Sequence, residues 1–332
     1  MPRVAVTDTS VAFVIGFNGL EAAIATSRES LRADQLIQLS PGGYRDPAIA
    51  SDGTNALVVW VEFDNLYAMR IGPEVNALSR QVLATNVGLA APAVAWNGSK
   101  YVIAWSQASN AILATTVERS GEYAGRITVI QHNGERVPKA ISIASSNGDS
   151  LLVWDRYTYD PTCAFLCSPI LQAEVDSVVL DPDGHPRNAS SILSPAGYDP
   201  DVASDGHEYF AIWTGFPNRG LFGRAVASDG MAQESVRIAS EPDYQGRIAW
   251  NGVSFYIVWL HQVFATYFVS YAPMDEHGTV GAPIQFAGRS IFDFDIAARS
   301  SGLVVLIHSS SGLPISPATV CYLDVRRRSV TR

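Results

Sequence analysis

The chain has 332 residues and a formal net charge of −9, and 47% of its residues are hydrophobic. An acidic protein repels phosphate backbones and anionic lipid headgroups, which disfavours nucleic acid and anionic membranes as partners. The uninterrupted apolar runs fall far short of the roughly 18 residues that a membrane-spanning helix needs, so we expect no membrane insertion.

One pattern of strands and turns returns along the whole chain. Its clearest copy, residues 200–213, reads as a short strand, an Asp-Gly turn and a second strand that ends on Trp. Each copy has an Ala in the first strand and a Trp or Ile ten residues later, in the pairs Ala5/Ile15, Ala50/Trp60, Ala95/Trp105, Ala144/Trp154, Ala203/Trp213, Ala249/Trp259 and Ala297/Ile307. Four-stranded units repeated at about 40–50 residues are typical of propeller blades.

We therefore predict an all-β fold, a single seven-bladed β-propeller with four-stranded antiparallel blades and almost no helix. The blades are expected at about residues 1–40, 41–86, 87–134, 135–195, 196–240, 241–288 and 289–332, with an insertion at residues 155–169. The fourth strand of the last blade would come from residues 327–330. Because the N-terminus begins on an inner strand, we expect closure without strand exchange and a looser seam. A two-sheet sandwich would not repeat one register seven times.

The repeat unit resembles a known kind of propeller. The pattern Pro-x-Val-Ala-x-Asp-Gly followed by Val-Val-Trp, as in residues 47–60 and 200–213, is similar to bacterial TolB-like and WD40-like repeats. The resemblance covers nearly the whole chain and implies an architecture rather than one function. Trp154-Asp155 is the only Trp-Asp pair, and the Asp box of sialidases is missing, which argues against a regular WD40 array and a sialidase.

Two cysteines bear on the compartment. Cys163 and Cys167 lie close together in the insertion, where a disulfide would indicate an oxidising environment; two reduced thiols are the alternative. The insertion contains no His, so a metal site is disfavoured. No signal peptide is visible, so either the protein is cytoplasmic or its leader is absent from this chain. The possible disulfide favours the second alternative, and we expect an extracytoplasmic, secreted or cell-surface protein of bacterial type.

The candidate binding face is the one where loops lead into the inner strands and where second strands turn into third strands. These loops surround the channel mouth, which is the concave part of a propeller. They place aromatic residues beside charged ones: Tyr44, Arg45, Asp46, Tyr198, Asp199, Tyr244, Phe292 and Asp293 before the inner strands, and Asp155, Arg156, Tyr157, His261 and His308 after the second strands. Such a set suits sugar recognition. Alternatively, the tyrosine rings cover blade edges and bind nothing.

A second pattern lies two residues before the Ala positions. In the fifth, sixth, seventh and first copies these residues are Asp201, Arg247, Asp295 and Arg3, whereas the other copies have Ala48, Ala93 and Ser142. Charges that alternate between adjacent blades are interpreted first as ion pairs that hold the blades together, because partly buried charges must be paired. The alternative is a polarised mouth in which Arg247 or Arg3 binds an anionic ligand.

Catalytic patterns are sparse. The chain has no nucleophile elbow, phosphate-binding glycine loop or zinc-protease motif. His261 could act as a base beside Tyr244 and Arg247 in a lyase-like site, but an exposed loop histidine explains it as well. We therefore assign no catalytic residues, no metal and no cofactor.

Three functional hypotheses remain. The first is a non-enzymatic, monomeric binding domain that recognises a glycan or a protein at the channel mouth. The second is a carbohydrate-active hydrolase or lyase at the same face, and the third is a structural scaffold for protein interactions.

Overall fold

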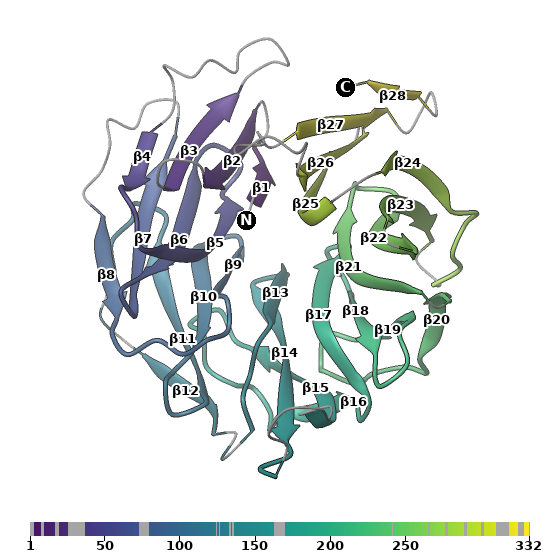
Figure 1. Cartoon of the computed structure of the whole chain (residues 1–332). Helices are drawn as coiled ribbons and strands as arrows, with labels where there is room; N and C mark the ends of the chain where they lie inside the picture. The colour runs from purple at the N-terminus through teal and green to yellow at the C-terminus, as the bar shows by residue number, and fades with distance from the viewer. Residues whose placement is uncertain are drawn as a thin grey trace.

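The computed structural model contains only β-strands in the part of the chain that it describes, which confirms the all-β prediction. That part is residues 3–331 without 8–9, 17–19, 26–36, 73–79, 124, 126, 133, 135, 163–169, 241, 265, 276–277, 289–290, 300–301, 310–318 and 325–328. The described strands form seven four-stranded antiparallel sheets, each made of four consecutive strands. The sheets stand around a central axis, as Figure 1 shows.

Each sheet runs from an inner strand at the axis to a fourth strand at the periphery. The inner strands are β1 (Arg3–Val6), β5 (Tyr44–Ser51), β9 (Ala93–Trp96), β13 (Ile141–Ser146), β17 (Gly197–Ser204), β21 (Asp243–Trp250) and β25 (Ile291–Arg299). The second strands are β2 (Val11–Gly16), β6 (Ala56–Glu62), β10 (Lys100–Ser106), β14 (Asp149–Tyr159), β18 (Tyr209–Gly215), β22 (Phe255–Val263) and β26 (Gly302–Ser309). The third strands are β3 (Leu20–Ala25), β7 (Asn65–Ile71), β11 (Ala111–Glu118), β15 (Ile170–Leu180), β19 (Leu221–Val226), β23 (Thr266–Met274) and β27 (Thr319–Asp324). The fourth strands are β4 (Ile37–Ser40), β8 (Gln81–Ala84), β12 (Thr128–His132), β16 (Ser191–Ser194), β20 (Val236–Ala239), β24 (Ile284–Gly288) and β28 (Ser329–Thr331).

The tryptophans of the repeat fill the spaces between adjacent sheets. Trp60, Trp105 and Trp154 have no exposed surface. Trp154 packs against Ala104 of the preceding sheet, and Trp213 packs against Val153 in the same way. An indole is large enough to bridge two twisted sheets, which explains why the Trp spacing reports the blade period.

The Asp-Gly turns form as the sequence predicts. In the second sheet Asp52 accepts hydrogen bonds from the backbone N–H groups of Thr54 and Asn55 at 2.9 and 2.7 Å. Gly53 follows with φ 92°, a conformation that a side chain would strain. This turn joins each inner strand to its second strand at the end of the blade that faces away from the mouth.

The ring closes where the first and last sheets meet. The first sheet consists of β1–β4 and the last of β25–β28, so closure without strand exchange is confirmed for the described strands. The backbone N–H of Val4 donates to Asp295 Oδ2 at 2.8 Å across this seam. The apolar part of the seam includes Val4, Phe13 and Val304. The expected looseness of this seam stays a prediction.

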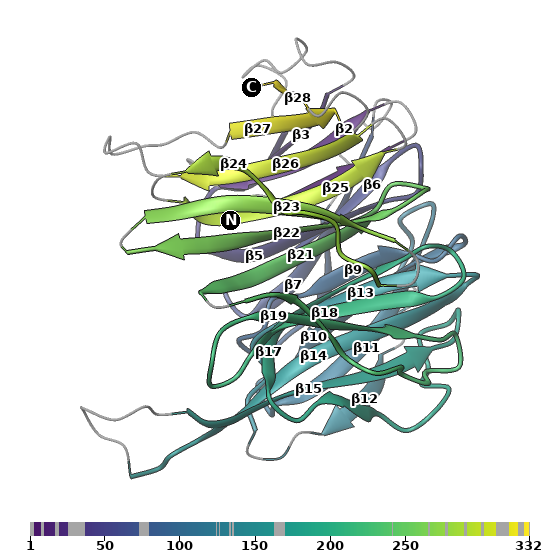
Figure 2. The ribbon, with the colours of Figure 1, turned by 90° about the vertical axis from the view of Figure 1, so that its right-hand side faces the viewer.

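The predicted insertion is wrong in its extent. Residues 155–159 belong to β14, which pairs with β15 in a hairpin of eleven residues on each side. The long hairpin extends beyond the neighbouring blades in Figure 2. Asp155, Arg156 and Tyr157 therefore lie on a strand and not in a mouth loop.

Candidate functional site

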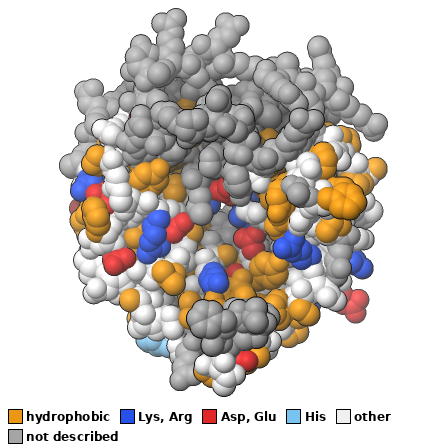
Figure 3. Space-filling view, viewed as in Figure 1, with side chains coloured by type: hydrophobic (Ala, Val, Ile, Leu, Met, Phe, Trp, Pro, Cys, Tyr) orange, Lys and Arg blue, Asp and Glu red, His pale blue; other side chains and the backbone are white. Residues whose placement is uncertain are grey.

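A cavity of about 360 Å³ lies among the inner strands, and it is lined by residues of β1, β5, β9, β13, β17, β21 and β25 together with the loops before them. Asp/Glu and Lys/Arg side chains gather in the central hollow of the molecule, with hydrophobic side chains around it (Figure 3). The register confirms which loops share this end, because Tyr44 pairs with Glu62 and Asp243 pairs with His261.

Bulges at the start of three inner strands turn polar side chains toward the cavity. The register shifts between Arg45 and Ala48, between Tyr198 and Asp201, and between Tyr244 and Arg247. Within these bulges Asp46, Asp199 and Gln245 have φ of 54°, 50° and 54°, and all three line the cavity. A bulge re-aims a side chain that regular pleating would send elsewhere.

Neighbouring blades hold two of these bulges in place. The backbone N–H of Asp199 donates to Asp155 Oδ2 at 2.9 Å, and the N–H of Gln245 donates to Thr214 Oγ1 at 3.1 Å. Each acceptor belongs to the second strand of the preceding sheet. The left-handed conformation is thus supported by a contact that exists only when the blades are assembled.

The charged residues predicted two positions before the Ala residues do meet in the cavity, but their pairing differs from the prediction. Arg247 Nη1 lies 3.4 Å from Asp199 Oδ1, and Arg3 Nη1 lies 3.1 Å from Asp293 Oδ2. Asp201 and Asp295 instead accept backbone N–H groups of the next inner strand, from Ile248 and from Val4, both at 2.8 Å. Each arginine therefore pairs with the aspartate that lies two residues closer to the mouth than the predicted partner.

Burial changes the acidity of these groups. Loss of hydration raises the pKa of Asp295 to about 6, and it also raises the pKa of Asp201. Burial alone would lower the pKa of Arg247, but the carboxylates of Asp199 and Asp201 outweigh it and raise the pKa of Arg247. The guanidinium is thus fixed in its charged form by the acids around it.

The other side of the cavity is mostly apolar. It is formed by β9, β13 and the loops before them, and its lining side chains are Leu89, Ala91, Pro92, Ala93, Val94, Ala140, Ile141 and Ile143. Polar groups mark its two edges. Asp46 pairs with Arg45 at 3.0 Å on one edge, and Ser142 Oγ donates to Asp201 Oδ1 at 2.6 Å on the other.

The tyrosines that the sequence predicts to bind a sugar are mostly used for packing. Tyr44 packs on the core between the first and second sheets, and Tyr244 packs on the core between the sixth and seventh. Tyr244 also makes an edge contact with Tyr267 at 6.3 Å and carries Arg219 over its ring at 4.4 Å. Burial raises the pKa of Tyr244 to about 12. None of Tyr44, Tyr198 and Tyr244 lines the cavity.

The tyrosines are also not equivalent in register. Tyr198 and Tyr244 both directly precede their bulges, whereas Arg45 holds that position in the second sheet and Tyr44 lies one residue earlier. Arg45 uses its place to donate to the carbonyl oxygen of Gly88 at 2.6 Å. The sequence already contains this offset, because Arg45, Tyr198 and Tyr244 each lie five residues before the repeated Ala and Tyr44 lies six residues before it.

The predicted residues of the fourth blade lie behind the cavity wall. Asp155 is 1% exposed and accepts hydrogen bonds from the N–H groups of Lys139 and Ala140 and from the hydroxyl of Tyr157. Burial raises the pKa of Asp155 to about 6. Arg156 Nε pairs with Asp176 at 2.7 Å. These contacts bind strands and loops to one another.

Lys139 is a cavity residue that the sequence analysis did not select. Its Nζ lies 4.9 and 5.3 Å from the rings of Tyr157 and Tyr159, which stack on each other. Lys139 belongs to the segment before β13, and it is one of only two lysines in the chain. The sequence could have indicated Lys139, because lysine is rare in this chain and this one comes just before an inner strand.

His261 has a defined partner. Its Nδ1 is hydrogen-bonded to Asp243 Oδ1, across the β21–β22 pair. A carboxylate on Nδ1 orients the ring and leaves Nε2 available, and the side chain is 34% exposed. His261 lies on a strand beside the mouth and does not line the cavity.

Some predicted residues cannot be placed in this site. Cys163 and Cys167 lie outside the described residues, and so do the side chains of Phe292 and His308. Their predicted roles stay predictions. Among the described residues, no group of His, Cys, Asp and Glu could hold a metal ion, and no helix is long and apolar enough to cross a membrane.

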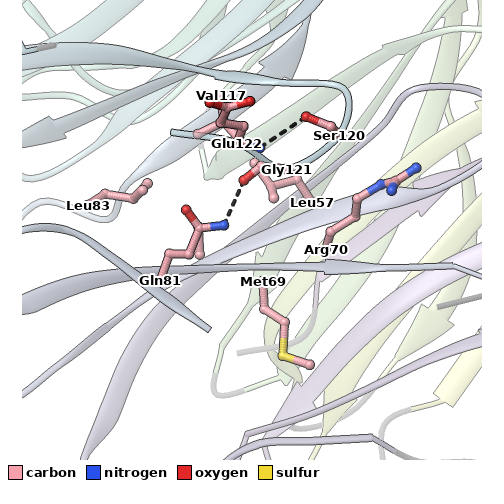
Figure 4. A pocket seen from close by; sticks show the side chains of 10 residues that line it. Leu57, Met69, Arg70, Gln81, Leu83, Val117, Ser120, Gly121 and Glu122 are labelled. Atoms are coloured by element: carbon pink, nitrogen blue, oxygen red, sulfur yellow. Dashed lines mark hydrogen bonds between the residues drawn. The ribbon is translucent and has the colours of Figure 1, made fainter. Parts of the chain in front are cut away.

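A second cavity, of about 310 Å³, lies between the second and third sheets away from the axis. Figure 4 shows its mainly apolar wall, including Leu57, Met69 and Leu83, with Arg70 at one side. Gln81 Nε2 donates to the carbonyl oxygen of Gly121 across it at 2.6 Å. This hydrogen bond and the apolar wall make it a packing gap between blades.

No protein family matches the chain, and no curated protein matches it. Solved structures do resemble it. The β-propeller domain of the Trilobed protease from Pyrococcus furiosus, with an open velcro topology, is 14% identical and has a TM-score of 0.60, with 99% of this chain and 95% of that chain covered. The SapL1 lectin in complex with alpha methyl fucoside is 12% identical, with a TM-score of 0.54 and coverage of 97% and 91%.

A prolyl endopeptidase is 13% identical with a TM-score of 0.63, and the match covers 99% of this chain but 48% of that one. Identities this low show a shared fold and carry no activity across. Together with the strand order, they establish that this chain belongs among the β-propellers built from four-stranded antiparallel blades.

Proposed function

We propose that this chain is a seven-bladed binding propeller that recognises a glycan or a protein at its channel mouth without catalysing a reaction. The observation that carries the proposal is the cavity of about 360 Å³ whose wall is charged on one side and apolar on the other. Asp199, Gln245 and Asp293 line it with side chains that can hydrogen-bond a ligand. A concave site with apolar walls and a few placed polar groups is typical of ligand binding.

The setting of the proposal is an extracytoplasmic bacterial protein that acts as a monomeric domain. The lectin neighbour is in complex with a sugar, which supports a glycan as one ligand class. The acidic net charge supports partners other than nucleic acid.

A glycan array with the purified protein tests the proposal, read beside the double variant Asp199→Asn, Gln245→Ala. Both substitutions change the cavity lining and lie outside the apolar clusters between the sheets. Because Asp199 pairs with Arg247 and Gln245 has positive φ, the melting temperature of the double variant is measured beside that of the wild type. The control is His207→Ala, an exposed side chain on the turn at the opposite end. Binding that falls at least about tenfold in the double variant and is retained in the control supports mouth recognition. If neither glycans nor peptides bind the folded protein, the scaffold function takes the place of this proposal.

A carbohydrate-active enzyme is the second candidate, and the His261–Asp243 pair favours it. A carboxylate that orients an imidazole is the usual arrangement around a general base. Each glycan that binds is incubated with the wild type and with His261→Ala, and new reducing ends are measured. Turnover by the wild type that His261→Ala abolishes would replace the binding proposal with an enzyme.

A further inference from the structure

Two phenylalanines stand exposed on turns at the mouth end of the molecule. Phe63, between β6 and β7, is 76% exposed, and Phe264, between β22 and β23, is 93% exposed. These turns follow second strands, so they share the end of the molecule with the bulges described above. Both side chains are large, apolar and in water, which the fold does not require.

The backbone at these positions makes phenylalanine a costly choice. Phe63 has φ 47° and Phe264 has φ 54°. Two-residue hairpin turns need positive φ, and Asn, Asp or Gly adopt it at least cost, whereas a bulky residue there is an outlier. Neither stability nor solubility explains a residue that is both strained and exposed. Recognition does, because strain of this kind accumulates at binding sites.

Phe63 is held in place although it is exposed. A Cβ added to Gly43 would lie 2.7 Å from the Phe63 ring, so the ring lies against the Gly43 backbone. The same turn receives a hydrogen bond from the N–H of Val87 to the carbonyl oxygen of Asp64 at 3.0 Å. Leu89, two residues after Val87 in the chain, is 73% exposed and lines the cavity.

The two phenylalanines belong to sheets that are not adjacent. Phe63 lies on the sheet β5–β8 and Phe264 on the sheet β21–β24, with the sheets β25–β28 and β1–β4 between them on the shorter way round. The two turns therefore lie on different sides of the ring in Figure 1. A ligand that contacts both turns must reach across the ring, past two intervening sheets.

The charge of the mouth favours a basic partner. The cavity wall carries five carboxylates, Asp46, Asp199, Asp201, Asp293 and Asp295, against the three cations Arg3, Lys139 and Arg247. Because Arg45 pairs with Asp46, one negative charge is left in excess. The whole chain has a net charge of −9, which also opposes binding to anionic membranes. Complementary charge steers association and selects partners.

We propose that Phe63 and Phe264 are the apolar anchors for a protein partner that spans the mouth and directs a Lys- or Arg-containing segment into the cavity. This inference rests on the proposed function of the cavity and assigns it a protein ligand. We call the two turns that carry Phe63 and Phe264 the rim. The rim supplies affinity through these two aromatic side chains, and the acidic cavity supplies selectivity for a basic segment.

A random-peptide display library selected on the purified protein provides the probe. Selected peptides are synthesised, and their affinities are measured by fluorescence polarisation on the wild type and on Phe63→Asn, Phe264→Asn. The matched control is Met231→Asn, Val253→Asn, which removes two similarly exposed apolar side chains at 70% and 74% exposure from turns at the opposite end. We expect peptides rich in Lys or Arg with apolar flanks, at least about tenfold weaker binding to the rim variant, and no change in the control.

The rim variant should also melt at the same temperature as the wild type or higher, because Asn tolerates positive φ better than Phe. A lower melting temperature would show that the two rings stabilise the fold, and that would overturn the inference. So would selected peptides without basic residues, or unchanged affinity in the rim variant. Binding to phosphatidylcholine vesicles that requires the two phenylalanines would assign the rim to a membrane instead.

The two proposals fail in different ways. Ligand binding that depends on Asp199 and Gln245 but not on Phe63 and Phe264 leaves the proposed cavity function standing and removes the protein-docking inference. Binding that depends on the phenylalanines but not on Asp199 and Gln245 keeps a docking rim and removes the cavity.

Discussion

The wall of the channel consists of a charged arc and an apolar arc. They differ in the residue that lies two positions before the repeated Ala on each inner strand. In the charged arc, on β17, β21, β25 and β1, this position holds Asp201, Arg247, Asp295 and Arg3, whereas in the apolar arc, on β5, β9 and β13, it holds Ala48, Ala93 and Ser142. The charged arc joins its inner strands with ion pairs and carboxylate–backbone hydrogen bonds. The apolar arc lines its share of the cavity with small and branched side chains.

The same arrangement of inner strands is therefore held together in one arc by charged groups and in the other arc by apolar packing. Buried charges must satisfy one another, so a change to one of them leaves its partners uncompensated. Small apolar residues need no charged partner, so a substitution in the apolar arc costs only the packing that is lost. The charged arc also spans the seam between the first and last sheets, where covalent continuity is absent.

The largest effect is expected from Arg247→Met. It removes the ion-pair partner of Asp199 and a cation close to Asp201, Asp293 and Asp295, so buried carboxylates lose charge compensation, at a cost of about 3–5 kcal/mol in the free energy of unfolding. Urea unfolding at pH 7 measures it, with the exposed Arg219→Met as control. The loss should be smaller at pH 5, where some of the carboxylates are protonated. A loss equal to that of the control would mean that the arc is not held together by charge.

A smaller effect is expected in the apolar arc from Ile141→Ala. Ile141 is 8% exposed and packs with Trp154 and Ala93, so its truncation should cost about 2–3 kcal/mol. The cost should not vary between pH 5 and pH 7, because no charge is involved. A strong pH dependence of this variant would contradict the separation of the two arcs.

The boundary between the arcs is tested by Ser142→Ala. Its hydroxyl donates to Asp201 at 2.6 Å, and losing a hydrogen bond to a carboxylate should destabilise the protein by about 1–2 kcal/mol. Ser145→Ala is the matched control, because that hydroxyl bonds Ser150 within the same sheet. Equal effects of the two variants would show that Asp201 draws no special support from the apolar arc.

The smallest effect is a change with pH. Burial raises the pKa of Asp295 to about 6, above its ordinary value of about 4, so the folded protein binds this proton more tightly than the unfolded chain. Stability from this group is present below about pH 4 and is lost as the pH rises through 6. Between pH 5 and pH 7 the wild type should lose about 1 kcal/mol more than Asp295→Asn does. If the free energy of unfolding changed equally with pH in the two proteins, the raised pKa of Asp295 would be refuted.

Much of the blade structure could be predicted from the sequence. Three local features predict it: the Ala-to-Trp spacing, the Asp-Gly turns and the lack of a helical period. The described residues accordingly form four-stranded sheets without helices, and Gly53 has positive φ in its turn. The set of charged inner-strand residues could also be found, because it lies at a constant offset from the repeat. These predictions succeed because pleating and turn geometry depend on residues that are neighbours in the chain.

The tertiary structure alone decided how those residues are used. Arg247 meets Asp199 from 48 positions away, and Arg3 meets Asp293 from 290 positions away, so neither pairing is encoded locally. The bulges that aim Asp199 and Gln245 into the cavity depend on Asp155 and Thr214 of preceding blades. From the sequence we predict Tyr44 and Tyr244 to bind a ligand, yet their rings are partly buried against adjacent sheets. A strand pattern specifies which face a side chain is on, and only the assembled ring specifies what that side chain meets.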